Sequence, residues 1–316
     1  MTDLTTTLAP AYPAGLPEGA PTDVDAVGPA APLPADDAAR PSRLRYAAGF
    51  VARRPGLVVA VGWLVVVLLA ALVPSLLASG DPLDGVPADK LTGPSAQHWF
   101  GTDQLGRDLY TRVVHGTGTT LHAALLAIAI GLVVGSVLGL LAGFVGGALD
   151  AVLMRFADVL LAIPGILLSL AVVTALGFGT VNVAIAVGTT SVASVSRILR
   201  SEVLRVRTSA YVEAARAGGS RWWRVLLVHV LPNSVGPVLV LAALELGTAI
   251  LAVSSLSFLG YGAQPPQPEW GSLVAGGRDY LAGQWWLTTL PGIVIALTVL
   301  AGNRLARALD SEGNPS

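Results

Sequence analysis

One side chain that could do chemistry in this sequence is an isolated carboxylate, Glu245. It lies about ten residues into an apolar stretch from Ser234 to Phe258, so an α-helix would place it ~15 Å deep, near the middle of a ~30 Å hydrocarbon core. An ionised carboxylate facing lipid there costs at least ~2.5–3.5 kcal/mol. We therefore expect Glu245 to be protonated or to face a polar interior, and our hypothesis is that it lines a translocation pathway.

A second group of charges, Asp150, Arg155 and Asp158, precedes a Pro164-Gly165 break in another apolar stretch. Arg155 and Asp158 are three residues apart, so they can pair on one helix face. Two interpretations stay open. The charges form a structural ion pair, or Asp158 lines the inner mouth of a pathway.

Metal binding is not expected, because the histidines are scattered and no carboxylate supplies a third ligand at helical spacing. The sequence has no cysteine, which excludes thiolate zinc sites and disulfides. These histidines are His98, His115, His122 and His229.

Nucleotide binding through a Walker A loop is excluded. Lys90 is the only lysine, and it is not part of a Gly-Lys-Ser/Thr sequence, so no Walker A loop can be written. Ser220 follows two glycines but has no base beside it, which argues against an intramembrane enzyme. If ATP drives this protein, then ATP and Mg²⁺ must bind on another subunit, with no cofactor held by this chain.

The composition indicates a membrane protein. Hydrophobic residues make up 53% of the 316-residue chain and charged residues only 12%, against about 25% charged in soluble domains. The net charge of −1 gives no indication of a nucleic-acid partner. We expect an all-α protein that crosses the lipid bilayer several times.

Six apolar stretches are long enough to cross a membrane. Their approximate bounds are 57–78, 120–145, 152–176, 181–198, 234–258 and 287–305.

Arginines predict the orientation of these spans. Five precede the first span, seven lie between Arg197 and Arg224, and two lie near the C-terminus. By the positive-inside rule both termini and the loop 199–233 are cytoplasmic, whereas the loops 79–119 and 259–286 are external. Residues 1–45, rich in Ala, Pro, Asp and Thr, are predicted to be a disordered cytoplasmic tail, so that 46–316 form the membrane domain.

Glycine recurs every four residues inside the second span. This spacing places the glycines on one helix face, where another helix can approach closely. The residues are Gly131, Gly135, Gly139 and Gly143.

A charged, helix-capable segment, Thr208–Asn233, lies between two apolar spans. Ser209 can cap a first helix and Gly218-Gly219 can end it. A second helix can start at Ser220 and continue until Pro232 stops it. A helix–turn–helix between membrane spans is suited to docking a partner.

Within this segment Glu213-Ala214-Ala215, Gly219 and His229-Val230-Leu231-Pro232 follow one another with the spacing of a known motif. The segment resembles the EAA loop of ABC-importer permease subunits. The usual pattern ends Ile-x-Leu-Pro, so His229 departs from it, but the ending His-Val-Leu-Pro-Asn is similar to the peptide-permease branch.

Two external motifs resemble the same family. Phe100–Asp108 reads FGTDQLGRD and Leu256–Gly271 reads LSFLGYGAQPPQPEWG, as in C-type permease subunits of dipeptide and oligopeptide importers. With the EAA loop they cover residues 95–305 in the family's order. Both are low in regular structure, and they either form a rim where a binding protein docks or fold over the helix bundle.

The resemblance implies a type I ABC-importer permease fold with six spans in the bacterial inner membrane. It also implies a homologous B-type permease partner, one or two ATP-binding subunits and an extracytoplasmic binding protein. The residues implied in coupling to the ATPase are Tyr211, Glu213, Ala214, Ala215, Gly219, Leu231 and Pro232. The external motif residues are Gly101, Asp103, Gly106, Arg107, Asp108, Gln264, Pro265 and Trp270.

The alternative function is a stand-alone secondary transporter or channel. No inverted repeat with paired broken helices is evident, and ionisable groups inside the spans are few, which argues against ion coupling. The sequence does not state the substrate, since similar permeases carry dipeptides, longer peptides, glutathione or nickel chelates.

Overall fold

The computed structural model describes residues 55–313, and over this range helices make up nearly all the regular structure. The predicted tail, residues 1–45, lies outside the described residues. Two isolated β-bridges, Gly85 with Arg107 and Thr102 with Asp108, organise the segment before α4. The α-helices are α2 (Pro55–Leu72), α3 (Pro74–Leu77), α4 (Leu109–Val145), α5 (Gly147–Ala162), α6 (Gly165–Leu176), α7 (Thr180–Arg207), α8 (Ala210–Ala217), α9 (Trp222–Arg224), α10 (Leu231–Ser234), α11 (Gly236–Phe258), α12 (Trp270–Gly277) and α13 (Trp286–Gly313).

Five of these helices, α2, α4, α7, α11 and α13, are long and apolar enough to cross a membrane. The predicted third span, 152–176, is instead a pair of helices, α5 and α6, bent by 98° at a break after Ala162. Pro164 lies in this break, where a residue without an N–H and with a fixed φ ends one helix and starts the next. The described chain therefore holds up to six spans.

Two helices extend beyond the predicted spans. α4 begins at Leu109 rather than near residue 120, because Asp108 caps it by accepting a hydrogen bond from the Thr111 N–H at 2.8 Å. α7 continues to Arg207 rather than stopping near residue 198, so the predicted loop 199–233 loses its first residues to this helix. The predicted external loop 259–286 contains the short helix α12.

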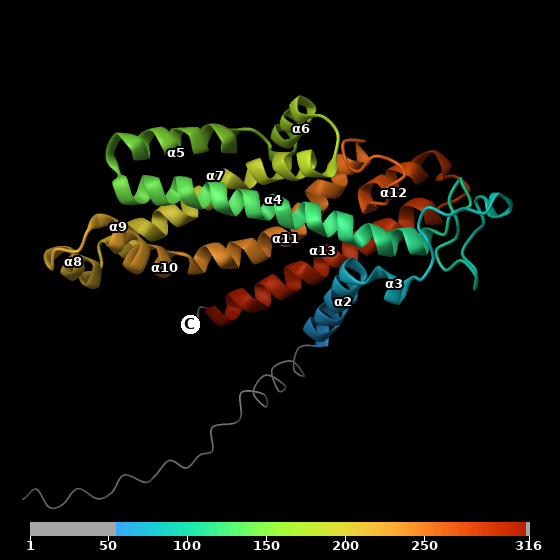
Figure 1. Ribbon diagram of the computed structural model, residues 1–316, viewed down its shortest axis with the longest axis horizontal. Helices are drawn as coiled ribbons and strands as arrows, with labels where there is room; N and C mark the ends of the chain where they lie inside the picture. The colour runs from blue at the N-terminus through green and yellow to red at the C-terminus, as the bar shows by residue number, and fades with distance from the viewer. Residues whose placement is uncertain (1–54, 314–316) are drawn as a thin grey trace, which may run out of the picture. The chain divides into compact units, whose positions relative to one another are not determined.

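The glycines of α4 pack directly on α7, as their spacing predicts. All four are buried, and α4 makes its most extensive helix contact with α7 (Figure 1). A Cβ at Gly135 would lie 2.7 Å from the Val195 Cβ, and one at Gly139 would lie 2.5 Å from the Ser196 carbonyl oxygen. Only glycine permits this approach of the two backbones.

Ion pairs join α5 to α7. The Arg200 guanidinium binds the Asp150 carboxylate through two hydrogen bonds, of which that from Nη2 to Oδ2 is 2.6 Å long. Asp158 pairs with Arg197 of α7. The spacing allowed Asp158 to pair with Arg155 on one helix face, but within residues 55–313 its carboxylate is paired with Arg197 across the two helices.

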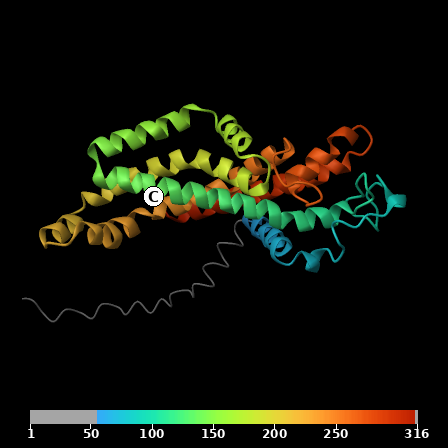
Figure 2. The same cartoon turned by 45° about the horizontal axis from the view of Figure 1, so that its top comes forward.

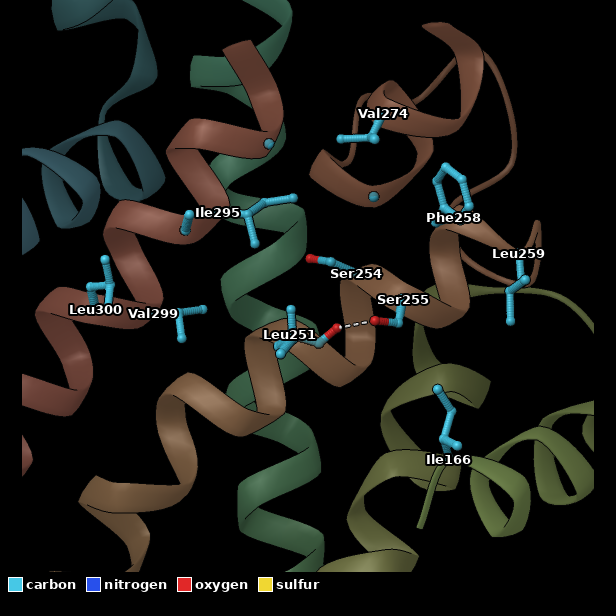
Figure 3. Close-up of a pocket in the computed structure, with 13 residues that line it drawn as sticks. Ile166, Leu251, Ser254, Ser255, Phe258, Leu259, Val274, Ile295, Val299 and Leu300 are labelled. Atoms are coloured by element: carbon cyan, nitrogen blue, oxygen red, sulfur yellow. Dashed lines mark hydrogen bonds between the residues drawn. The ribbon is translucent and has the colours of Figure 1, made fainter. Parts of the chain in front are cut away.

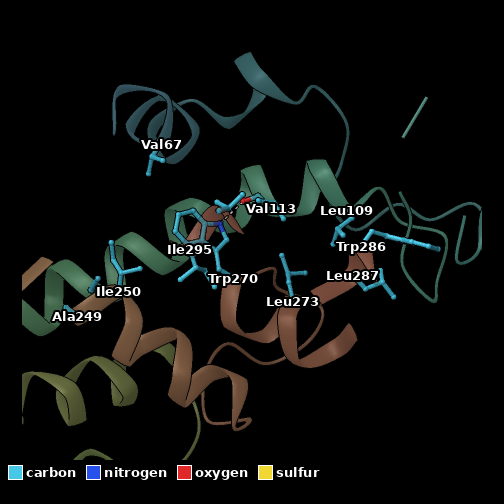
Figure 4. Close-up of a cluster of buried hydrophobic side chains, with 12 residues drawn as sticks. Val67, Leu109, Val113, Ala249, Ile250, Trp270, Leu273, Trp286, Leu287 and Ile295 are labelled. Carbon is cyan, nitrogen blue, oxygen red and sulfur yellow. Dashed lines mark hydrogen bonds between the residues drawn. The ribbon is translucent and has the colours of Figure 1, made fainter. Parts of the chain in front are cut away.

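A buried cluster joins α4, α11, α12 and α13, and Trp270 lies at its centre (Figure 4). The Trp270 side chain is completely buried, and its indole Nε1–H donates to the Val113 carbonyl at 3.0 Å. A buried indole needs such a partner. Ile295 and Leu273 pack beside it, so the short helix α12 is held by its first residue.

Alanine at Gly271 is expected to destabilise the protein strongly, whereas alanine at Gly276 of the same helix is not. A Cβ at Gly271 would lie 2.2 Å from the Ser254 carbonyl oxygen, while one at Gly276 meets no atom within 4 Å. Overpacking typically costs about 1–3 kcal/mol, and Gly→Ala in an open helix position gains about 0.5–1 kcal/mol. Thermal unfolding in detergent measures both, and equal melting temperatures for the two variants would contradict this packing.

Candidate functional site

α8, the helix that carries the Glu-Ala-Ala sequence, has one buried face and one exposed face. Val212 is completely buried in a cluster with Val206, Val225 and Val230, and Ala215 packs against the same cluster. The side chains on the other face are exposed; these are Tyr211, Glu213 and Ala214. The helix is thus anchored through an i, i+3 pair and offers the remaining motif residues to a partner.

The turn after α8 has a fixed geometry. Gly219 has a φ of +77°, its N–H donates to the Arg216 carbonyl at 3.0 Å, and the Ser220 N–H donates to the Ala215 carbonyl at 3.1 Å. These two bonds form a Schellman motif, in which the left-handed position is usually glycine. A Cβ at Gly219 would meet no atom within 4 Å, so the backbone conformation, not lack of space, requires glycine here.

The start of α8 differs in one detail from the prediction. Ser209 occupies the N-cap position with extended backbone angles, but its side chain makes no capping bond. Its Oγ instead donates to the Val206 carbonyl at 2.6 Å, which closes the end of α7.

Contacts with the end of α4 hold this segment in place. Arg207 donates from Nη1 to the Gly143 carbonyl at 2.7 Å, satisfying a free carbonyl at a helix C-terminus where a cation is favoured. The Arg216 guanidinium lies 5.8 Å from the centre of the Phe144 ring, and Trp222 lies 6.5 Å from the same ring. Sequence reasoning missed Arg207, since nothing in its neighbours indicates a helix end 64 residues earlier.

Pro232 does not stop the second helix, contrary to the sequence expectation. The helix starts after Arg221, which is its N-cap, and passes through a π-helical turn, Val225–Val230, into α10. Because the wider π turn bonds the Leu231 N–H to the Leu226 carbonyl, Pro232 falls in the first turn of α10, where its missing N–H costs nothing. Leu231 is half-buried and Pro232 is exposed.

The first loop motif, residues 100–108, is organised by the Asp103 carboxylate. Its Oδ1 accepts the N–H groups of Leu105 at 2.8 Å and Arg107 at 3.0 Å. Its Oδ2 accepts from Arg107 Nε at 2.7 Å and lies 3.6 Å from Arg112 Nε. One carboxylate therefore organises a turn and faces two guanidinium groups.

Gly101 and Gly106 of this motif both have positive φ, +73° and +76°. At Gly106 a Cβ would collide with the Val86 carbonyl oxygen at 1.9 Å, so glycine is required both by conformation and by close approach. Asp108 accepts from Thr111 through Oδ1 and contacts His98 Nδ1 through Oδ2 at 2.9 Å. These residues shape the loop and cap α4.

In the second loop motif, residues 256–271, Gln264 and Pro265 are exposed, whereas Trp270 is buried. The residue before Trp270, Glu269, was not singled out by sequence reasoning, although it is completely buried. Its carboxylate caps α12 by accepting from the N–H groups of Gly271 at 3.0 Å and Ser272 at 2.9 Å. Burial raises the pKa of the Glu269 carboxyl, and these donors oppose the increase. A carboxylate directly before an apolar run could have indicated this cap.

The segment 208–233 and the two loop motifs, 100–108 and 256–271, lie at opposite ends of the helix bundle within residues 55–313 (Figures 1 and 2). The two loop motifs, far apart in sequence, lie on either side of one cavity of about 300 Å³. It is lined by Asp103, Arg107 and Arg112 from one side and by Pro265, Pro266 and Gln267 from the other.

The two residues predicted to line a pathway are not brought together, and each contacts α7 separately. Glu245 is half-buried, and it accepts a hydrogen bond from the Ser191 hydroxyl at 3.1 Å. Asp158 binds Arg197, with each side chain about half exposed. Glu245 thus has a polar partner on a neighbouring apolar helix, and Asp158 has a cationic partner on α7.

An apolar groove of about 710 Å³ lies between α11, α12 and α13. Leu251 and Ser254 of α11 face Ile295 and Val299 of α13 across it, with Ile166 of α6 on the far side (Figure 3). No charged side chain lines it.

Taken together, the fold is that of a polytopic helical membrane protein with a short helix, α8, held with one face exposed at one end and two shaped loops at the other. Residues 135–312 match the family described as "Binding-protein-dependent transport system inner membrane component". The chain therefore belongs to this family of ABC-importer permeases and is a multi-pass protein of the bacterial inner membrane.

Curated relatives agree with this assignment. The chain is 37% identical to the dipeptide transport system permease protein of Alkalihalophilus pseudofirmus over 248 residues, 78% of this chain and 82% of the relative. It is 40% identical to the probable D,D-dipeptide transport system permease protein of Escherichia coli K12, over 76% of this chain and 80% of the relative. It is also 39% identical to the glutathione transport system permease protein of Pectobacterium atrosepticum, over 83% and 88%.

Among solved structures, the chain is similar to a crystal structure of an amino acid ABC transporter with histidines. The TM-score is 0.50 at 15% sequence identity, covering 64% of this chain and 94% of that chain. This likeness concerns the fold alone.

Proposed function

We propose that this chain is the C-type permease subunit of an ATP-driven importer that moves dipeptides or oligopeptides into the cytoplasm. The observation that carries the proposal is α8, which is fixed to α4 and α7 yet presents Glu213 on an exposed face. The names of the relatives, which include dipeptide and glutathione systems, support a peptide-like substrate.

In this proposal the termini and the 208–233 segment are cytoplasmic, and α8 sits in a cleft of an ATPase subunit. ATP and Mg²⁺ bind to one or two such partner subunits, which do the hydrolysis, so this chain is not itself an enzyme. Closure of the ATPases moves α8, and the cluster around Val212 transmits the motion to α7 because a packed core moves as a unit. A homologous B-type permease completes the pathway, and an extracytoplasmic binding protein delivers substrate to the outer loops.

Glu245 is the residue we assign to the translocation pathway. Replacement by glutamine removes the charge and keeps the shape, so transport is expected to fall several-fold, with a different loss for cationic and anionic peptides. Uptake of peptides of different charge, at equal membrane levels of protein, measures this.

Ser191→Ala is the matched control, because it removes the hydroxyl that bonds Glu245 and leaves the carboxylate in place. If the two residues are merely a structural pair, S191A and E245Q will behave alike. Wild-type transport by E245Q for every peptide would remove Glu245 from the pathway.

The proposed function is tested by purifying the tagged full-length chain in mild detergent and identifying what accompanies it by mass spectrometry. Recovery of a second permease, Walker A ATPases and a peptide-binding protein supports the importer. A stable, monodisperse chain that transports alone in liposomes would instead support a stand-alone secondary transporter or channel.

A further inference from the structure

The cavity between the two loop motifs, 100–108 and 256–271, is lined by more positive than negative side chains, and the structure of the loops alone does not explain this excess. Three charged residues line it, the carboxylate of Asp103 and the guanidinium groups of Arg107 and Arg112. Two cations therefore share one anion in a largely enclosed space of about 300 Å³.

The Asp103 carboxylate, the one anion among the described residues of this lining, already accepts several hydrogen bonds. Asp103 accepts two backbone N–H groups through Oδ1 and Arg107 Nε through Oδ2. These three hydrogen bonds use most of the capacity of a carboxylate. Asp103 is thus the hydrogen-bond partner of Arg107, and it faces Arg112 as an ion pair at 3.6 Å without a hydrogen bond.

Arg112 is left without an anionic hydrogen-bond partner within residues 55–313. Its side chain is only 7% exposed, and its Nη1 donates to the Pro82 carbonyl at 2.9 Å. Its Nε–H is buried and makes no hydrogen bond, since Asp103 Oδ2 is 3.6 Å away. A buried guanidinium donor that makes no hydrogen bond is costly, and the ion pair with Asp103, which Arg107 shares, does not supply that bond.

The rest of the cavity fits a small organic anion. Leu109, Leu273 and Leu287 form apolar walls, which strengthen an ion pair by excluding water. Arg112 also lies in the first turn of α4, where the helix dipole is positive. The volume is at the small end of ligand pockets, enough for a group of dipeptide size.

We propose that this cavity binds the free carboxylate of a short peptide, with the Arg112 guanidinium as the main donor and Arg107 beside it. Arg–carboxylate pairs are strong and geometrically specific. The inference deepens the proposed function and rests on it, because it names a feature of the substrate and a place at the outer end of the bundle where the permease recognises it.

The test compares dialanine, N-acetyl-dialanine and dialanine amide as ligands of the purified full-length chain in nanodiscs, by isothermal titration. The two ligands with a free carboxylate are expected to bind alike, and the amide at least tenfold more weakly. Equal affinity of acid and amide would overturn the proposal. This comparison needs no variant, so it holds even where a substitution impairs folding.

Variants then locate the site. Arg112→Gln is expected to abolish the preference for the free acid. Gly276→Leu should block binding of all three ligands, because a Cβ there points into open space and Gly276 lines the cavity. Arg278→Gln is the matched control, since Arg278 is exposed and does not line this cavity. Undiminished binding of dialanine by both R112Q and G276L would place the carboxylate elsewhere and overturn the assignment.

Two other outcomes separate this inference from the proposed function. If R112Q binds dialanine normally but releases the binding protein, the arginine contacts an acidic side chain of that protein and the inference fails. Recovery of ATPases with the tagged chain does not depend on Arg112. If ATPases are recovered while acid and amide bind equally, only the inference fails. If the acid is preferred but no ATPase is recovered, only the proposed function fails.

Discussion

Valine at Gly219 is expected to abolish transport almost completely while the protein still inserts into the membrane at normal levels. The φ of +77° at this position is costly for any residue with a side chain, about 1–2 kcal/mol or more, and most costly for a β-branched one. The chain can relieve the strain only by breaking the bonds of Gly219 to Arg216 and Ser220 to Ala215. The direction of α8 would then change relative to the proposed ATPase cleft.

The expected readout is uncoupling. Peptide uptake should fall by more than tenfold, which corresponds to about 1.4 kcal/mol of lost coupling, while basal ATPase activity of the assembled complex remains. Uptake assays and ATPase assays on the same membranes measure the two effects separately.

Gly218→Ala is the matched control for this prediction. Gly218 has a negative φ, −74°, with ψ 9°, and a Cβ there would lie 3.4 Å from the Ala214 carbonyl oxygen and 3.7 Å from that of Ala215, both ordinary contact distances. We expect near-normal uptake for G218A. Comparable losses in G218A and G219V would mean that the turn is sensitive to any added atom, and the argument from backbone conformation would fail.

The contrast between these neighbouring glycines shows what sequence reasoning could reach. The pair Gly218-Gly219 indicated the end of a helix, because local backbone preferences depend on a few adjacent residues. The spacing from Glu213 to Gly219 indicated an EAA loop. The four-residue spacing of glycines in α4 similarly predicted a helix contact, which proved to be with α7. Features of this kind depend on residues that are close together in the sequence.

Features that depend on distant partners were not predictable in the same way. Only Arg155 is within helical spacing of Asp158 in the sequence, and it is the packing of α5 on α7 that brings Arg197 to this carboxylate. Pro232 was expected to end a helix by its local chemistry, but the preceding π turn accommodates it. The buried Arg112 Nε–H makes no hydrogen bond within the described chain because of how three segments meet in the folded chain: the Pro82 loop, the Asp103 turn and α4.

Reversal of charge at Glu213, by replacement with lysine, is the second change expected to uncouple ATP hydrolysis from transport. Glu213 is exposed on α8, and its side chain forms no hydrogen bond or ion pair with other residues in the 55–313 range. Whatever this carboxylate contributes must therefore come from a partner. A cation in the first turn of a helix also opposes the helix dipole, but by only about 0.3–1 kcal/mol when exposed.

The melting temperature of the isolated chain should accordingly change by little in Glu213→Lys, while co-purification with the ATPase subunits and peptide uptake both fall by tenfold or more. Glu213→Gln separates charge from shape, because it keeps the side-chain length and a hydrogen-bond acceptor; an intermediate loss is expected. Replacement of Arg216 by glutamine should instead lower the melting temperature, since Arg216 contacts Phe144 within this chain. Full uptake by E213K with normal recovery of the ATPases would refute the assignment of α8 as the docking helix.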